Sequence, residues 1–195
     1  MSKSDPSASK KTRNTTIRWV VLIFIVTIVV SAIISFVSDA IMEASSMGVA
    51  FLILLAIVMI GIIFDIIGVA VTSADEKPFH SMAARKVPGA QESIQLLRKA
   101  GRVSSICNDV VGDICGVISG SASATIVAQI VNHFDFSLSQ FVGLFMSALV
   151  AGLTVGGKAI GKTFAIGSCT AIVQFVGQLI WGLHNLPLLF RRNKK

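Results

Sequence analysis

Apolar residues along this chain gather in long runs, separated by short polar or charged stretches. A helix rises about 1.5 Å per residue, so about 20 apolar residues cross the ~30 Å hydrocarbon layer of a membrane. Runs of that length predict four membrane-spanning helices, over residues 17–38, 48–72, 104–132 and 138–157. We therefore expect an all-α integral membrane protein.

The remaining segments are polar enough to lie at a membrane surface. Residues 78–102 contain two helix-forming stretches, separated by the helix-breaking sequence Val87-Pro88-Gly89. We expect two short surface helices there. Residues 163–189 are long enough to cross the membrane, but polar side chains mark one face of this stretch: Ser168, Gln174, Gln178 and Asn185. Such a stripe is typical of an amphipathic or re-entrant last helix.

The composition excludes an ordinary soluble domain. Hydrophobic residues make up 53% of the chain, charged residues only 14%, and the mean hydropathy is +0.79, whereas soluble domains carry about a quarter charged residues. The net charge of +7 does not point to nucleic acid, because the basic residues adjoin apolar runs and do not interleave with aromatic residues. We expect the lipid bilayer as a partner, and no nucleic acid.

The basic residues also predict the orientation in the membrane, because Lys and Arg near spans stay on the cytoplasmic side. They cluster in residues 1–16, between the second and third spans, and in residues 190–195, whereas the other two connections contain none. With four spans all three clusters fall inside. We therefore expect a multi-pass protein of the plasma or cytoplasmic membrane, with a disordered tail at 1–16, one domain at 17–189 and a basic tail at 190–195.

The third span carries acids and glycines on one face. At about 100° per residue, seven small or polar residues of this span fall within about one third of the helix circumference. They are Ser105, Asp109, Gly112, Asp113, Gly116, Gly120 and Ser123. Glycines spaced by four let a second helix approach closely. An ionised carboxylate near the bilayer centre costs at least about 2.5 kcal/mol, so it usually faces a partner or a pathway. Asp109 and Asp113 are the strongest candidates for an ion pathway, and Asp65 on the second span is a third.

The chemistry of these side chains favours a hard cation. Carboxylate and hydroxyl oxygens suit Mg²⁺ or Ca²⁺, and the sequence offers no His or Cys cluster for softer metals. The three cysteines form neither a disulfide framework nor a zinc motif. No catalytic or phosphate-loop motif accompanies the acids, so we expect neither an enzyme nor an organic cofactor. The alternative for Asp113 is a structural ion pair with a lysine such as Lys158.

Three short motifs occur in order between residues 48 and 189. The first, Ser73-Ala74-Asp75-Glu76-Lys77-Pro78-Phe79-His80-Ser81, follows the second span, and the second, Gly112-Asp113, lies in the third span. The last, Gly157-Lys158-Ala159-Ile160-Gly161-Lys162-Thr163-Phe164-Ala165, follows the fourth. In this order and spacing the chain resembles the membrane domain of the CorB/CorC and cyclin M family of magnesium transporters, without the cytoplasmic CBS-type regulatory domains that usually follow it.

The resemblance implies a homodimer, a belt of cytoplasmic surface helices and transport of Mg²⁺ held between the spans by oxygen atoms. The family has Asn at the position of Asp113 and Glu at the position of Lys158, and both bind the ion there. A lysine ammonium cannot ligate a cation, so the family's site is not carried over intact. A pair between Lys158 and Asp113 would satisfy both charges and replace the cation structurally.

Three hypotheses follow. The first is a divalent-cation transporter or binding protein, with Asp109, Asp113 and Ser73 as metal ligands and Asp65, Gly112, Gly120 and Lys158 along the ion pathway. The second is a non-transporting membrane module for packing or partner binding, in which Lys158 pairs with Asp113. The third is proton-coupled transport of another solute by the same acids.

Overall fold

The computed structural model describes residues 6–43, 45–134 and 139–192, and its regular structure in those residues is entirely helical. In chain order the helices are α1 (Pro6–Glu43), α2 (Met47–Ser73), α3 (Lys77–Ala84), α4 (Ala90–Arg98), α5 (Ala100–Ser104), the π-helix η1 (Ser105–Gly112), α6 (Asp113–Phe134), α7 (Ser139–Gly167) and α8 (Cys169–Arg192). Four stretches in this part of the chain are long and apolar enough to cross a membrane: Ile17–Ser38, Met47–Ser73, Ala100–Val131 and Phe141–Gly167. The predicted all-α class with four candidate spans is confirmed.

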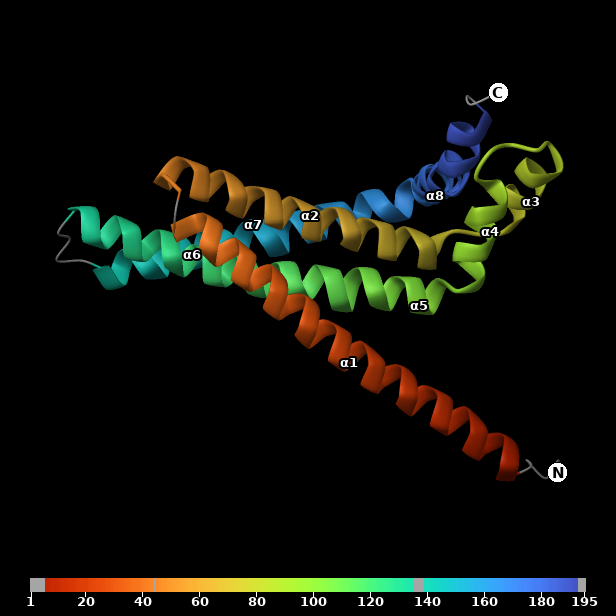
Figure 1. Ribbon diagram of the computed structural model, residues 1–195, viewed down its shortest axis with the longest axis horizontal. Coiled ribbons are helices and arrows are strands. Elements are labelled where there is room, and N and C mark those ends of the chain that lie inside the picture. The colour runs from red at the N-terminus through yellow and green to blue at the C-terminus, as the bar shows by residue number, and fades with distance from the viewer. Residues whose placement is uncertain (1–5, 44, 135–138, 193–195) are drawn as a thin grey trace.

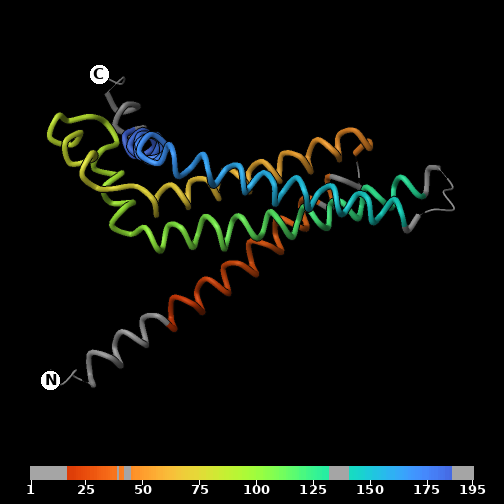
Figure 2. Tube along the Cα trace, turned by 180° about the vertical axis from the view of Figure 1, so that it is seen from behind, coloured from red at the N-terminus to blue at the C-terminus, as the bar shows by residue number. Residues whose placement is uncertain are grey.

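Helices α3, α4 and α8 gather at one end of the other helices. Figure 1 shows them together at the end where α1 begins and α8 finishes, while the last turn of α6 and the first turn of α7 lie at the opposite end. In Figure 2 part of α8 is seen end-on although α2 and α6 run across the view, so α8 crosses the end of the bundle. An even number of long helices gives this arrangement, because it returns the chain to the end at which it started.

Helix α2 is the central element, and it contributes to two hydrophobic clusters. The first cluster joins α2 to α6 and α7 and consists of Ala50, Leu54, Val58, Ala122, Ile126, Met146 and Val150. The second joins α2 to α3, α4, α8 and the last part of α7 and consists of Val69, Ala70, Val71, Phe79, Ile94, Leu97, Ala165 and Val173. The apolar run of α2 therefore packs against α6 and α7 in one half and against α3, α4, α8 and the end of α7 in the other.

Helix α1 packs on the outside of the bundle. Its Ile23 and Val30 contact a third cluster, formed by Val110 of η1 and by Ile114 and Ile118 of α6. The Arg102 guanidinium also lies 5.2 Å from the centre of the Trp19 ring, which is within reach of a cation–π contact. In Figure 1 α1 diverges from the other helices toward its start.

Tight backbone contacts join α4, and the turn before it, to α8. Gly89, between α3 and α4, has φ +81°, a conformation that glycine adopts without strain, and a Cβ atom there would lie 2.7 Å from the Gln178 Cα of α8. The Ser93 hydroxyl lies 2.9 Å from the Gly89 carbonyl oxygen and 3.1 Å from that of Val173. Helices α4 and α8 therefore meet with their backbones close together.

Several helix boundaries differ from the sequence prediction. Helix α1 begins at Pro6, within the predicted tail at 1–16, while residues 1–5 lie outside the described residues. Helix α7 continues to Gly167 instead of ending at 157, and α8 begins at Cys169 instead of 163. No proline interrupts residues 158–167, and the glycines there cost helix stability but allow close packing. A Cβ atom at Gly161, for example, would lie 2.8 Å from the Ile66 side chain.

The predicted C-terminal tail at 190–195 also differs in part. Helix α8 includes residues up to Arg192, and residues 193–195 lie outside the described residues. The third span contains the π-helix η1 where an unbroken α-helix is the sequence expectation.

Candidate functional site

The backbone changes its winding where the predicted acidic face begins. Over Ser105–Gly112 the helix is of the π type, and the Asp113 N–H donates to the Asn108 carbonyl oxygen five residues earlier. Such wide turns hold more residues per turn than an α-helix and are frequent at functional sites. Asp109 lies within η1 and Asp113 directly follows it. The 100° spacing of an α-helix, which places both on one face in the sequence prediction, therefore does not hold between them.

Three charged side chains from three different helices meet just after this turn. The Lys158 Nζ of α7 lies 3.9 Å from the Asp65 Oδ1 of α2 and 3.9 Å from the Asp113 Oδ1 of α6. We call these three residues the charged triad. The sequence hypothesis that Lys158 pairs with Asp113 agrees with this contact, and Asp65 is a second partner of the same ammonium group.

Gly112 lies beside the charged triad. A Cβ atom at this position would lie 3.5 Å from the Lys158 Nζ and 3.8 Å from the Asp65 Oδ1, which are ordinary van der Waals distances. The backbone at the end of η1 is therefore a direct neighbour of the ammonium and of the Asp65 carboxylate. The structure brings together four of the predicted site residues: Asp65, Gly112, Asp113 and Lys158.

The members of the charged triad differ in exposure. The Asp65 side chain is 17% exposed and that of Lys158 is 26% exposed, whereas 73% of the Asp113 side chain is exposed. With both carboxylates and the ammonium ionised, one negative charge remains uncompensated. An uncompensated charge is costly to hold among apolar helices, so an additional cation or water beside Asp113 would lower this cost.

The other predicted site residues lie apart from the charged triad. Asp109 is exposed on η1 and Ser73 is the exposed last residue of α2. In residues 6–43, 45–134 and 139–192 no ion pair or hydrogen bond joins Asp109 or Ser73 to the triad, and no group of three or more His, Cys, Asp or Glu side chains is placed to hold a metal ion. The set Asp109, Asp113 and Ser73 as metal ligands stays a prediction. Gly120 faces a cavity between α6 and α7.

Sequence reasoning missed Asn108 as a residue of this region. Its Nδ2 donates to the Ser104 hydroxyl at 3.3 Å, and its Oδ1 is buried without a hydrogen-bond partner among the residues that the structure describes. The amide also lies directly against Gly68 of α2, where a Cβ atom would overlap the Asn108 Oδ1. The sequence does show an amide side chain within an apolar run. Which helix that side chain faces depends on the winding of η1, which the sequence did not predict.

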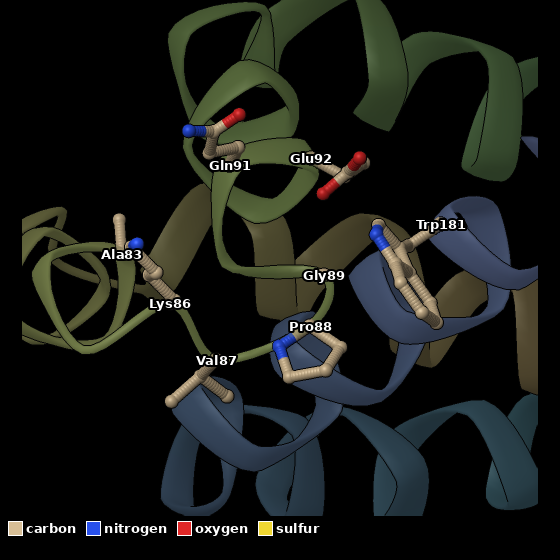
Figure 3. Close-up of a pocket in the computed structure, with 8 residues that line it drawn as sticks. All are labelled: Ala83, Lys86, Val87, Pro88, Gly89, Gln91, Glu92 and Trp181. Atoms are coloured by element: carbon tan, nitrogen blue, oxygen red, sulfur yellow. The ribbon is translucent and has the colours of Figure 1, made fainter. Parts of the chain in front are cut away.

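A hollow of about 230 Å³ lies at the surface-helix end of the molecule, away from the charged triad. Figure 3 shows Glu92 of α4 and Trp181 of α8 facing one another beside the turn that carries Pro88 and Gly89. Lys86 also lines this hollow. None of the predicted site residues does, so it is separate from the acidic face.

No protein-family model, no curated protein and no solved structure matches this chain. The resemblance to the CorB/CorC and cyclin M family therefore remains a prediction from the sequence motifs.

Proposed function

We propose that this protein is a multi-pass membrane protein that binds and transports a divalent cation, with Mg²⁺ as the leading candidate, at the charged triad. In this proposal the cation and the Lys158 ammonium exchange as the counter-charge of the Asp65 and Asp113 carboxylates. The single observation that carries it is the position of Lys158 Nζ, 3.9 Å from a carboxylate oxygen of each acid.

Charge balance supports an exchange of this kind. Two carboxylates neutralise one divalent cation, and their hard oxygen atoms suit Mg²⁺. When the cation leaves, the Lys158 ammonium compensates part of the same charge and limits the cost of holding the acids among apolar helices. The lysine stem is long and flexible, so the ammonium can withdraw when a cation arrives. The contacts of 3.9 Å are loose enough for such a displacement.

The arrangement of the helices supports a path across a membrane. The charged triad joins three of the four candidate spans, so movement of one span relative to another changes the distances among its charges. The clusters of Lys and Arg lie in segments that favour the cytoplasmic side, and the proposal places both termini there. The sequence resemblance adds a homodimer in the plasma or cytoplasmic membrane.

A second candidate function is favoured by the same contact. Lys158 already pairs with both acids, so the charged triad can serve as a fixed structural link in a non-transporting packing or partner-binding module. In the third hypothesis, proton-coupled transport, a proton compensates the remaining negative charge in place of a metal ion.

Ion flux separates the candidates. We expect purified protein in proteoliposomes to take up Mg²⁺, and both Asp65→Asn and Asp113→Asn to abolish the uptake. Asp75→Asn is the matched control, because Asp75 is an exposed acid outside the spans. Absence of flux for every divalent cation with folded protein would refute transport and leave the packing module. Proton flux without divalent flux would favour the third hypothesis.

A further inference from the structure

A second feature lies beside the charged triad, between α6 and α7, where hydroxyl groups line a space whose remaining surface is mostly apolar. It is a cavity of about 220 Å³, and the lining residues on which its chemistry depends are Gly116, Ser119, Gly120 and Ser123 of α6 with Ser147 and Thr154 of α7. Thr154 precedes Lys158 by four residues and Gly116 follows Asp113 by three, so each lies about one helical turn from the triad. From there the lining continues along both helices to Ser123 of α6 and Ser147 of α7. We call it the hydroxyl cavity.

Its hydroxyl groups present oxygen lone pairs. The Ser119 hydroxyl donates its proton to the Gly116 carbonyl oxygen at 2.9 Å, and the Thr154 hydroxyl donates to the Val150 carbonyl oxygen at 2.8 Å. Their donors are therefore used within their own helices, while their oxygen atoms can still accept hydrogen bonds or contact a cation. The space is open, because no heavy atom lies within 4 Å of a Cβ atom built on Gly116 or Gly120.

Ser123 gives an independent argument that a polar molecule occupies the hydroxyl cavity. It lines the hydroxyl cavity, only 2% of its surface is exposed, and its Oγ has no hydrogen-bond partner in the part of the chain that the structure describes. Buried polar groups in folded proteins are nearly always hydrogen-bonded, and ordered water often supplies the bond. A lipid tail cannot supply it.

We infer that the hydroxyl cavity holds water and admits a hydrated cation, forming an access path to the charged triad from the α6–α7 end. One water needs about 10–15 Å³ of such space, so the cavity has room for several. It is smaller than the ~300 Å³ or more typical of sites for organic ligands. The inference deepens the proposed function, on which it rests for the identity of the cation.

Three consecutive residues of α6 provide the test. Ala122 lies in the apolar core, Ser123 lines the cavity and Ala124 is exposed on the outer surface, all at nearly the same depth. In a chain whose Cys107, Cys115 and Cys169 are replaced by alanine, single cysteines are introduced as Ala122→Cys, Ser123→Cys and Ala124→Cys. The full-length protein in liposomes is exposed to Ag⁺, a cation that reacts with thiolates. The unreacted thiol is then counted with a maleimide after denaturation.

The expected result is a reaction at Ser123→Cys that is about tenfold or more faster than at the other two positions, because thiolates form in water and are suppressed in apolar surroundings. A rate at Ser123→Cys as slow as at Ala122→Cys would mean that the cavity is dry, filled by a lipid tail or closed by a second copy, and would overturn the inference. Equal rates at Ser123→Cys and Ala124→Cys would also overturn it, since the water would then not be confined to the cavity.

A second pair of cysteine variants, on α7, keeps the test valid if one of the α6 variants does not fold. Ser147 and Ala148 of α7 are both exposed, but only Ser147 lines the cavity, so the same difference in rate is expected between Ser147→Cys and Ala148→Cys. The accessibility test requires no transport. Fast reaction without Mg²⁺ flux would therefore retain the water path and refute the proposed function, whereas flux with an unreactive Ser123→Cys and an unreactive Ser147→Cys would refute the path alone.

Discussion

Lys158 contacts carboxylates on two other helices, so its removal leaves acids without a counter-charge between the spans. We expect Lys158→Met to lower the free energy of unfolding by about 1–3 kcal/mol, less than the loss at a fully buried pair because the side chain is 26% exposed. The measurement is thermal unfolding in detergent. Lys162→Met is the control, because Lys162 lies one turn further along α7 and is exposed.

The two acids should respond differently to the loss of Lys158. Asp65→Asn added to Lys158→Met should restore most of the stability, because the Asp65 side chain is only 17% exposed and depends on the ammonium. Asp113→Asn should restore less, since 73% of that side chain is exposed. Additive losses for Lys158→Met and Asp65→Asn in this double-mutant cycle would contradict a coupled pair.

Asn108 and Gly68 give a second prediction for single residues. A methyl group at Gly68 would overlap the Asn108 amide, so Gly68→Ala should destabilise the protein by about 1–3 kcal/mol, as overpacking does. Gly48→Ala at the start of the same helix should be neutral, because nothing lies within 4 Å of a Cβ there. Equal unfolding temperatures for the two variants would contradict the close contact between α2 and η1.

The charged triad shows what a sequence reveals about single residues. Lys158 and Asp113 were predictable as a pair, because a basic and an acidic residue stand at positions of adjacent spans that two motifs mark. Asp65 was predictable as an acid in an apolar run, but its contact with the same ammonium depends on how α2 packs between α6 and α7. Ser123 lay on the predicted polar face, but nothing in the sequence showed that α7 would leave a cavity there.

Helices α4 and α8 meet through small residues, and this contact holds the surface helices on the bundle. A methyl group at Gly177 would overlap the Ser93 hydroxyl, so Gly177→Ala should separate α8 from α4 and increase cleavage of the α3–α4 segment in limited proteolysis. Gly182→Ala on the same helix meets nothing within 4 Å and should leave the cleavage pattern unchanged. Equal protection in both variants would contradict this docking.

At the scale of elements, long apolar runs predicted the four candidate spans well, because a candidate span is defined by its length and hydrophobicity. The π-helix η1 was not predicted, because no local motif marked it; in the structure it packs against α2. The continuation of α7 past 157 was missed because glycine is a weak helix former in isolation, whereas Gly157 and Gly161 are accommodated by contact with Ile62 and Ile66.

The whole molecule has its surface helices at one end and the α1–α2 connection away from them (Figure 1), which predicts opposite accessibility for the two regions. In the cysteine-free chain, Lys86→Cys should react with an impermeant thiol reagent only from the cytoplasmic side. Ser46→Cys at the start of α2 should react only from outside. Labelling of both from the same side of sealed vesicles would contradict the orientation expected from the basic clusters.

The central claim is that a divalent cation and the Lys158 ammonium compete for the same two carboxylates. The most direct test measures the unfolding temperature of the protein as a function of Mg²⁺ concentration, because a ligand stabilises the folded state that binds it. The quantity compared is the Mg²⁺ concentration needed to raise this temperature. The account predicts that Lys158→Met lowers this concentration by about tenfold or more and that Asp65→Asn abolishes the effect. The same Mg²⁺ dependence in the unsubstituted protein and in both variants would contradict it.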